Sequence, residues 1–267
     1  MVFSSLLFIC LFLPMNLAAY YICTNNRQRN VIMLIFSLIF YAWGEPKYVF
    51  LLLFMTFVCW LCAIMIDRYK DTDKKKSKLF ITLACIVSLA LIGVFKYSNF
   101  LISNIASVTG LAIPEAQISL PIGISFYTFQ LLSYVIDVYR KDVPAQKNFF
   151  WLLLYSSLFH QCIAGPIVRY KDVQYDILNR RVNYREIADG ITRFCVGLGK
   201  KVLIANLLGT ICSVYRDSAD PSVLYAWIYA FSYSLQIYFD FSAYSDMAIG
   251  LGKILGLNFL ENFNYPY

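Results

Sequence analysis

Residues 236–267 read "QIYFDFSAYSDMAIGLGKILGLNFLENFNYPY" and place two carboxylates, Asp240 and Asp246, in a stretch apolar enough to lie in a membrane. An ionisable side chain costs at least about 2.5 kcal/mol at the centre of a membrane helix, so it faces a partner or a water-filled cavity. Gln236, Asp240 and Tyr244 recur four residues apart and share one helical face, whereas Asp246 faces another side. The stretch predicts a membrane helix with a functional polar face. The alternative is that each acid lies near the interface or pairs with an arginine.

The composition of the whole chain indicates the same environment. Of the 267 residues, 60% are hydrophobic and 15% are charged, and the mean hydropathy is +0.60. The apolar residues form continuous blocks of roughly 15–25 residues, the length that crosses a bilayer as a helix. Continuous rather than alternating hydrophobicity excludes a β-barrel. The sequence therefore predicts an all-α, polytopic bundle of transmembrane helices, inserted as a multi-pass protein in the lipid bilayer of the inner (plasma) membrane.

Clusters of lysine and arginine divide the apolar blocks and predict which side each loop occupies. Basic loops mark the cytoplasmic side of membrane proteins, so four basic regions are placed there: 24–30, 67–78, 140–147 and 169–201. The segment 104–119 has no basic residue and is placed outside. This assignment predicts helices near 3–22, 31–43, 48–66, 79–100, 120–139, 191–215, 223–241 and 242–257, with the polar segment 172–190 at the cytoplasmic surface.

The block 149–168 does not fit a simple crossing, because the loops on both sides of it are basic. It contains Gly165 and Pro166, which together break a helix in mid-membrane. Irregular backbone at that depth is tolerated only where protein buries it or water lines it. The block therefore predicts a re-entrant segment.

A second polar face is predicted in "LPIGISFYTFQLLSYVIDVYR", residues 120–140. Tyr127, Gln130, Tyr134 and Asp137 recur at spacings of three, four and three, which places them on one side of a helix. One interpretation is the wall of a pocket or channel. The other is that these groups hold neighbouring helices together through hydrogen bonds, as membrane bundles often do.

Other residue types exclude several classes of function. The chain has one histidine, His160, and its eight cysteines are scattered through apolar blocks, which argues against a zinc site or any other metal site. Cys59 and Cys62 form a C-x-x-C inside a membrane helix, where packing is the favoured role. The net charge of +7 is typical of cytoplasmic loops, and no nucleic-acid-binding motif is present.

At these residues the chain resembles the membrane-bound O-acyltransferase (MBOAT) family, in its bacterial alginate O-acetyltransferase membrane-subunit branch. The resemblance is carried by residues 120–140, by "IAGPIVRY" at 163–170 and by the stretch quoted at the outset. Relatives continue beyond "NFNYPY" into a segment with a Trp-His pair that holds the catalytic histidine. The resemblance thus implies that residues 1–267 are the N-terminal part of a single membrane domain, inactive alone. No catalytic residue is assigned, since His160 matches a position that is generally proline.

The resemblance implies an O-acyltransferase, most simply an acetyltransferase, that modifies an exported or cell-envelope polysaccharide such as alginate. The acyl group would come from a cytoplasmic thioester donor, acetyl-CoA or an acyl-carrier protein, with no tightly bound cofactor. It would pass through a membrane tunnel to the polymer or to an extracytoplasmic acyltransferase partner protein. In this interpretation the tunnel is lined or braced by Tyr127, Gln130, Asp137, Gln236, Asp240, Tyr244 and Asp246.

Two further predictions accompany the tunnel. Arg169 would lie near the cytoplasmic mouth, and the eight cations of 169–201 would attract a phosphate-bearing donor. The positive-inside rule alone also explains those cations. The alternative function is a polytopic transporter or a flippase of envelope precursors, because such proteins also need buried acids, broken helices and a polar path.

Overall fold

A computed structural model describes residues 2–110, 114, 118–161, 168–216, 218 and 222–263. Within these residues the chain is helical, with connecting turns and no strand, so the predicted all-α class is confirmed. Three helices among them are long and apolar enough to cross a membrane: Pro46–Tyr69, Lys74–Thr109 and Tyr184–Arg216. The shorter segment Phe8–Ile22 is also apolar. The protein is therefore a multi-spanning membrane protein.

The chain divides into two compact units. Unit 1 comprises Met1–Ile32, Ala164–Val168 and Asp172–Tyr267, and unit 2 comprises Met33–Ile163 and Arg169–Lys171. The prediction of one membrane domain over 1–267 stays a prediction.

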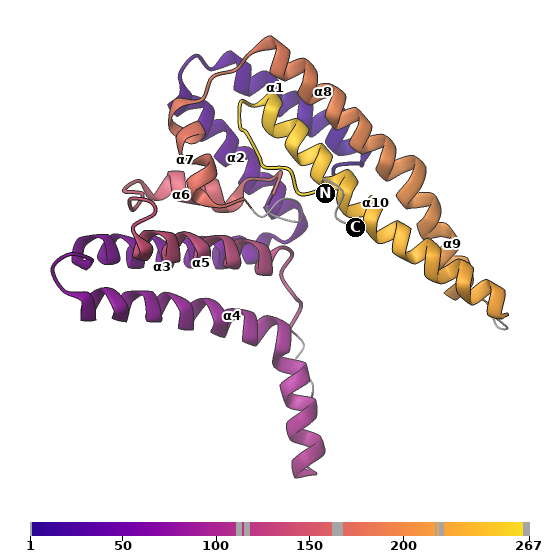
Figure 1. Ribbon diagram of the computed structural model, residues 1–267, viewed down its shortest axis with the longest axis horizontal. Helices are drawn as coiled ribbons and strands as arrows, with labels where there is room; N and C mark the ends of the chain where they lie inside the picture. The colour runs from indigo at the N-terminus through magenta and orange to yellow at the C-terminus, as the bar shows by residue number, and fades with distance from the viewer. Residues whose placement is uncertain are drawn as a thin grey trace. The chain divides into compact units, whose positions relative to one another are not determined.

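Helices appear in chain order as Figure 1 labels them. Their bounds are η1 Phe8–Phe12, α1 Leu13–Ile22, α2 Asn26–Gly44, η2 Pro46–Tyr48, α3 Val49–Tyr69, α4 Lys74–Thr109, α5 Ile124–Arg140, α6 Phe149–Ser157, α7 Tyr170–Asn179, α8 Tyr184–Gly199, η3 Lys200–Ala205, α9 Asn206–Arg216 and α10 Val223–Ile254.

Polar caps and left-handed residues explain where the longest helices begin and end. Asp73 accepts hydrogen bonds from the backbone of Lys75 and Lys76 and starts α4, which ends at Gly110 with φ +69°. Ser222 caps the start of α10 in the same way. Its end is set by Gly256, whose φ of +72° places it in the left-handed region that glycine adopts without strain.

Two predicted boundaries were wrong. Residues 223–241 and 242–257 were predicted as separate helices, but α10 runs without interruption from Val223 to Ile254. Its small residues did not end the helix because their helical backbone packs against α8, and the left-handed turn comes only at Gly256. In addition, α4 extends to Thr109, so part of the predicted loop 104–119 is helical.

The helix predicted over 191–215 begins earlier. Asn183 caps the first turn, so α8 starts at Tyr184 inside the segment that was predicted to lie at the cytoplasmic surface. The helical path then continues through η3 and α9 to Arg216.

The predicted re-entrant block is only partly covered by the structure. It begins as α6, whose nine residues rise too little to cross a membrane alone. Gly165 and Pro166 lie outside the described residues, so re-entry stays a prediction. The predicted sidedness of the loops is likewise untested.

In unit 2, α3 packs against α4, α5 and α6. Its core is built from large side chains, including the fully buried Leu52, Met55, Tyr127 and Tyr155. In unit 1, α8, η3 and α9 pack along α10, and Figure 1 shows α8 (orange-brown) beside α10 (yellow). Charged residues line part of this second contact.

Candidate functional site

The predicted polar face of α5 is buried within unit 2. Tyr127, Gln130, Tyr134 and Asp137 are each at most 1% exposed. The side-chain amide of Gln130 has no hydrogen-bond partner among the described residues. Burying an unpaired amide costs free energy, so this face is polar beyond what helix packing requires.

Asp137 forms an ion pair with Arg169, which lies just before α7. The aspartate is fully buried, whereas the arginine side chain remains 40% exposed. The pair thus joins the buried end of α5 to a charge that reaches the surface of unit 2. Whether Arg169 lies at a cytoplasmic tunnel mouth is not tested by this contact.

Tyr134, on the same face, has a structural role that the sequence pattern did not reveal. Its hydroxyl accepts a hydrogen bond from the backbone N–H of Gln146 at 2.8 Å. The side chain of Gln146 in turn donates to the hydroxyl of Tyr170 at 2.8 Å. Tyr134 and Tyr170 also meet edge to face, with ring centroids 4.9 Å apart. These contacts hold the 141–148 loop to the start of α7.

In unit 1, α8 and α10 approach closely because glycines remove side chains from the contact. A Cβ atom on Gly190 would lie 2.7 Å from the carbonyl oxygen of Gly250, and one on Gly250 would lie 2.7 Å from that of Gly190. Gly197 meets the backbone of Ala243 and Met247 in the same way. Small residues allow such backbone approach in membrane bundles, and here they bring charged neighbours within reach of each other.

The acids of α10 are paired with cations of α8 and η3. Asp246 accepts from Arg193 at 2.9 Å and from Lys200 at 2.6 Å. Asp240 accepts from Lys201 at 2.6 Å. The alternative of ion pairing is therefore confirmed for Asp246, while Asp240 pairs with a lysine instead of an arginine. The tunnel roles of both acids stay predictions.

Arg193 also forms an ion pair with Glu261, which follows α10. The guanidinium of Arg193 holds the pKa of the Glu261 carboxyl below its usual value. This contact fixes the segment after α10 to α8.

The other two predicted residues of α10 contact neutral groups. The amide of Gln236 lies against α9, because its Nε2 is 2.9 Å from where a Cβ on Gly209 would stand. The ring of Tyr244 stacks on Phe3, with centroids 4.6 Å apart. The structure places these residues and both acids in unit 1, whereas Tyr127, Gln130, Asp137 and Arg169 belong to unit 2. A common tunnel lined by all of them stays a prediction.

A π-helical turn explains how two consecutive lysines both reach α10. Lys200 and Lys201 are the first two residues of η3. Consecutive residues of a regular α-helix point about 100° apart, but the wider turn and the long lysine stems bring both ammonium groups to α10. Sequence reasoning assigned these cations to the cytoplasmic surface and missed the contact. One sequence feature could have revealed this contact. Arg193 and Lys200 are seven residues apart, as are Gly190 and Gly197, so the two cations repeat along the helix with the same period as the two glycines of the contact.

Five of the eight cations in 169–201 are engaged within the protein, and the attraction of a phosphate-bearing donor by this stretch stays a prediction. These are Arg169, Arg180, Arg193, Lys200 and Lys201. The structure leaves fewer positive charges for a soluble ligand than the sequence suggested.

Arg180 is the buried member of that set and organises one end of unit 1. It donates to the side-chain oxygen of Asn30 at 2.5 Å and to the hydroxyl of Tyr20 at 3.3 Å. Tyr20 itself donates to the carbonyl of Leu255 at 2.6 Å. Arg180 therefore ties the start of α2 and the end of α1 to the turn after α10.

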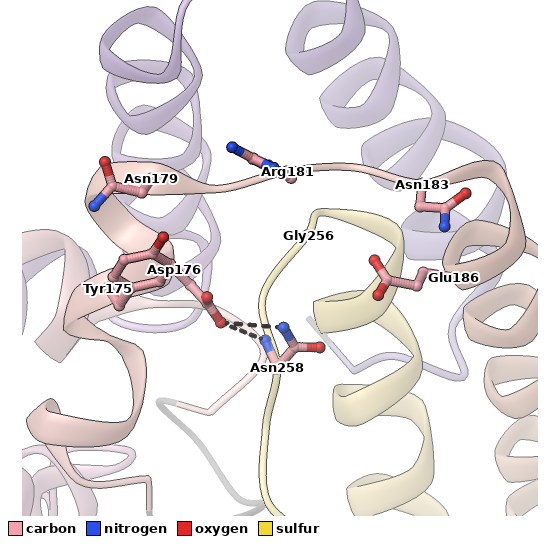
Figure 2. A pocket seen from close by; sticks show the side chains of 8 residues that line it. All are labelled: Tyr175, Asp176, Asn179, Arg181, Asn183, Glu186, Gly256 and Asn258. Atoms are coloured by element: carbon pink, nitrogen blue, oxygen red, sulfur yellow. Dashed lines mark hydrogen bonds between the residues drawn. The ribbon is translucent and has the colours of Figure 1, made fainter.

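Beside this turn lies a polar cavity of about 460 Å³, shown in Figure 2. Side chains from α7, from the link to α8, from α8 and from the turn after α10 line it: Tyr175, Asp176, Asn179, Arg181, Asn183, Glu186, Gly256 and Asn258. Asp176 accepts from the backbone and the side chain of Asn258, at 2.9 and 3.4 Å, as the dashed lines mark. None of these residues was predicted as a site residue.

The lining of this cavity suits a ligand rich in amides or hydroxyls. Two carboxylates face one guanidinium among the described lining residues, so the cavity is a poor site for a phosphate. Its volume falls in the range typical of small-molecule sites.

His160, to which the sequence analysis assigned no catalytic role, lies in a packed environment. It is fully buried in unit 2, and its ring stacks on Phe159 with centroids 4.3 Å apart. The seven described cysteines are all free, including the pair Cys59 and Cys62 on α3.

Long apolar helices, a buried polar face and charges paired within a tight helix contact together define a multi-spanning membrane protein with a polar interior. Comparison with known proteins then gives its family. The model of the membrane-bound O-acyltransferase family matches residues 35–266. The chain belongs to this family, as the resemblance implied.

Three relatives illustrate the range of the match. A probable alginate O-acetylase AlgI from Pseudomonas syringae pv. tomato is 40% identical over 272 residues, which cover 100% of this chain and 52% of the relative. A peptidoglycan O-acetyltransferase from Helicobacter pylori is 33% identical over 299 residues, covering 100% of this chain and 56% of the relative. A teichoic acid D-alanyltransferase from Bacillus subtilis is 28% identical over 156 residues, covering 55% and 38%.

The chain thus spans about half the length of the curated relatives that match it throughout. These relatives are transferases, and none of them supports the alternative of a transporter or flippase.

Proposed function

We propose that this protein acts as a membrane O-acyltransferase that acylates a polymer of the cell envelope. One observation carries the proposal: the whole chain is 40% identical to a probable alginate O-acetylase and 33% identical to a peptidoglycan O-acetyltransferase. Acetyl is the group that both names specify, so O-acetylation of a polysaccharide is the preferred reaction. Alginate is one candidate acceptor and peptidoglycan is another.

The acyl donor in this proposal is a cytoplasmic thioester, either acetyl-CoA or an acyl-carrier protein. Both donors carry a pantetheine arm, which combines amides and hydroxyls with no charge of its own. The polar cavity beside the turn after α10 suits such an arm, because its asparagines and carboxylates can bind amide and hydroxyl groups. No tightly bound cofactor is needed.

The path of the acyl group is proposed to follow the buried polar faces. Tyr127, Gln130 and Asp137 give α5 a polar interior face that is closed to lipid. On α10, Asp246 is 15% exposed and paired with two cations, and Asp240 is 41% exposed beside Lys201. Polar groups are retained at such depth where they bind substrates or brace those that do.

The acceptor side of the proposal lies outside the cytoplasm. The acyl group reaches the polysaccharide directly or through an extracytoplasmic acyltransferase partner protein. An envelope polymer as acceptor and a cytoplasmic thioester as donor together place the protein in the inner (plasma) membrane.

The decisive experiment replaces the α10 acids in a full-length relative. Asp→Asn at the position matching Asp240 should reduce acetyl esters on the polymer by about tenfold or more, since an ordered polar path contributes several kcal/mol to such reactions. The protein level in the membrane should stay unchanged. Asp189, an exposed acid of α8 outside the described ion pairs, provides the control, and its Asp→Asn variant should acetylate normally. Full acetylation with the Asp240 variant would remove that residue from the mechanism.

A further inference from the structure

A second cavity, of about 340 Å³, lies in unit 2, and none of the residues that line it is used in the proposed reaction. Its lining comes from three helix ends: the end of α3, the start of α4 and the end of α5. The residues are Lys70, Lys74, Ser77, Tyr139 and Lys141. Three of the five are lysines, and the described lining includes no acid.

Acids near this cavity reduce its positive charge only in part. Lys70 pairs with Asp67 at 2.6 Å and Lys141 pairs with Asp71. The contact between Lys141 and Asp71 is between exposed side chains, and such pairs contribute little. Lys74 belongs to none of the described ion pairs. The cavity therefore presents ammonium donors to any anion that enters it.

A buried hydroxyl supplies the second observation. Ser77 is 2% exposed, and its Oγ has no hydrogen-bond partner among the described residues. Because Ser77 lines the cavity, a ligand oxygen placed there would receive the hydrogen bond that the hydroxyl is able to donate. Buried polar groups normally have such a partner.

The backbone at Lys141 gives independent support. Lys141 is the only non-glycine residue with positive φ among those described, at +68°. This left-handed position directly after α5 is one that glycine usually occupies, because a Cβ atom is strained there. A lysine therefore stands at a position where glycine would be less strained, and this lysine lines the cavity.

The cavity lies at the charged ends of two helices that are long and apolar enough to cross a membrane, which is where lipid headgroups would be expected. The spanning segment Pro46–Tyr69 ends one residue before Lys70, and the span Lys74–Thr109 starts with Lys74. Basic pockets between membrane helices at such a boundary bind the headgroups of anionic lipids. We propose that this cavity binds the phosphate of an anionic phospholipid, with the three lysines as counter-ions and Ser77 as a hydrogen-bond donor.

A lipid fits this position better than a free phosphate for a physical reason. The acyl chains of a lipid remain in the bilayer beside α3 and α4 while its phosphate enters the cavity. The lipid is thus present at high local concentration, whereas a soluble anion must pay the full entropic cost of binding.

The test is native mass spectrometry of the purified chain, exchanged into nanodiscs of phosphatidylcholine with or without phosphatidylglycerol. We expect retained phosphatidylglycerol on the chain. The triple variant Lys70→Gln, Lys74→Gln and Lys141→Gln should weaken that retention by about tenfold or more, since each lysine contributes roughly fivefold near such a surface.

The matched control removes the same charge outside the cavity. Lys75→Gln, Lys78→Gln and Lys147→Gln alter three exposed lysines of the same two basic regions, 67–78 and 140–147, and none of the three lines the cavity. This variant should retain phosphatidylglycerol within about twofold of the unchanged chain. Equal losses in the two triple variants would overturn the proposal, because they would show attraction by net charge alone.

Two single variants separate binding from folding. Ser77→Ala should weaken retention, although it removes only an unpaired hydroxyl and should leave thermal unfolding unchanged or slightly improved. Lys141→Gly should raise the unfolding temperature by relieving the left-handed strain while weakening retention. Retention unchanged in both variants would overturn the site. Displacement of the lipid by inorganic phosphate at millimolar concentration would show a soluble anion to be the ligand and would overturn the lipid assignment.

Discussion

The polar faces of α5 and α10 look alike in the sequence, but the structure treats their acids differently. Asp137 on α5 is fully buried and its only described cation, Arg169, is partly exposed. On α10, Asp246 is 15% exposed between two cations, and Asp240 is 41% exposed beside one. The spacing of polar residues therefore identifies a polar helix face, while burial and ion pairing decide how much each charge contributes to the free energy of unfolding.

The two helices also differ in how they are packed. The buried face of α5 contains large side chains such as Tyr127, Leu131 and Tyr134. The contact between α8 and α10 depends on glycines that leave no room for a Cβ atom. Unit 1 thus gains its ion pairs through close backbone approach, and unit 2 buries its acid beneath side chains.

The largest effect should come from removing the partner of the buried acid. Arg169→Gln leaves Asp137 with a buried charge and should cost about 3–5 kcal/mol of unfolding free energy. Asp137→Asn should cost clearly less, because the arginine it leaves is 40% exposed. Thermal unfolding in detergent measures both. If both variants lost the same unfolding free energy, the difference in solvent exposure between Asp137 and Arg169 would not affect the cost of leaving either one unpaired.

A steric change should sharpen the comparison of packing. Gly250→Ala places a Cβ 2.7 Å from the carbonyl of Gly190 and 2.8 Å from the amide of Phe194. Backbone atoms cannot move aside easily, so we expect a loss of about 1–3 kcal/mol. Gly199→Ala is the control, since its Cβ would meet nothing within 4 Å. That variant should be neutral or slightly stabilising, and a similar loss in both would contradict the tight contact.

The two acids of α10 should differ from each other by a smaller amount. Asp246→Asn removes the acid that Lys200 and Arg193 share, so that Lys200 loses its carboxylate while Arg193 keeps Glu261, and should cost about 1–3 kcal/mol. Asp240→Asn removes a partly exposed pair and should cost less than about 1 kcal/mol. Unfolding of the two variants, measured in the same detergent, gives the order. The reverse order would show that the described pairing of Asp246 does not persist in the membrane.

The smallest effect concerns pH. The pKa of Glu261 is lowered by Arg193, so the pair stabilises the fold above the unfolded-state pKa of glutamate. This contribution is lost as the pH falls through the lower folded-state pKa. Unfolding temperatures of the unchanged chain and of Glu261→Gln should differ slightly at pH 7 and converge at acidic pH. If the difference in unfolding temperature persisted at acidic pH, its cause would be the packing of the Glu261 side chain and not its charge.

Much of the fold could be predicted because membrane helices leave strong local signals. The helix containing Tyr127 to Asp137 and the interruption between the helices predicted near 31–43 and 48–66 were found from hydropathy and spacing alone. The helix boundary predicted near residue 242 was wrong, because the small residues after Ser242 continue α10 as far as Ile254. Their helical backbone is stabilised by contact with α8, which lies some 50 positions away in sequence.

The candidate site was predicted only in part, for a related reason. The acids of α10 were identified from their cost in a membrane, but their partners Arg193, Lys200 and Lys201 were assigned to a basic region on the cytoplasmic side. The polar cavity was missed because its lining joins α7 to residues after α10. No sequence pattern in either segment indicates that the two segments lie close together in space.

The sequence by itself determined that this protein spans a membrane, that its helices carry two polar faces and that it belongs to the O-acyltransferase family. These properties follow from hydropathy, periodicity and motifs, which are local or are carried by similarity. Only the tertiary structure decided which charges are paired, which are buried and where cavities form. Pairing, burial and cavities depend on contacts between segments that are distant in the sequence. The free energies of these contacts change with distance and solvent exposure, and no single stretch of sequence specifies either quantity.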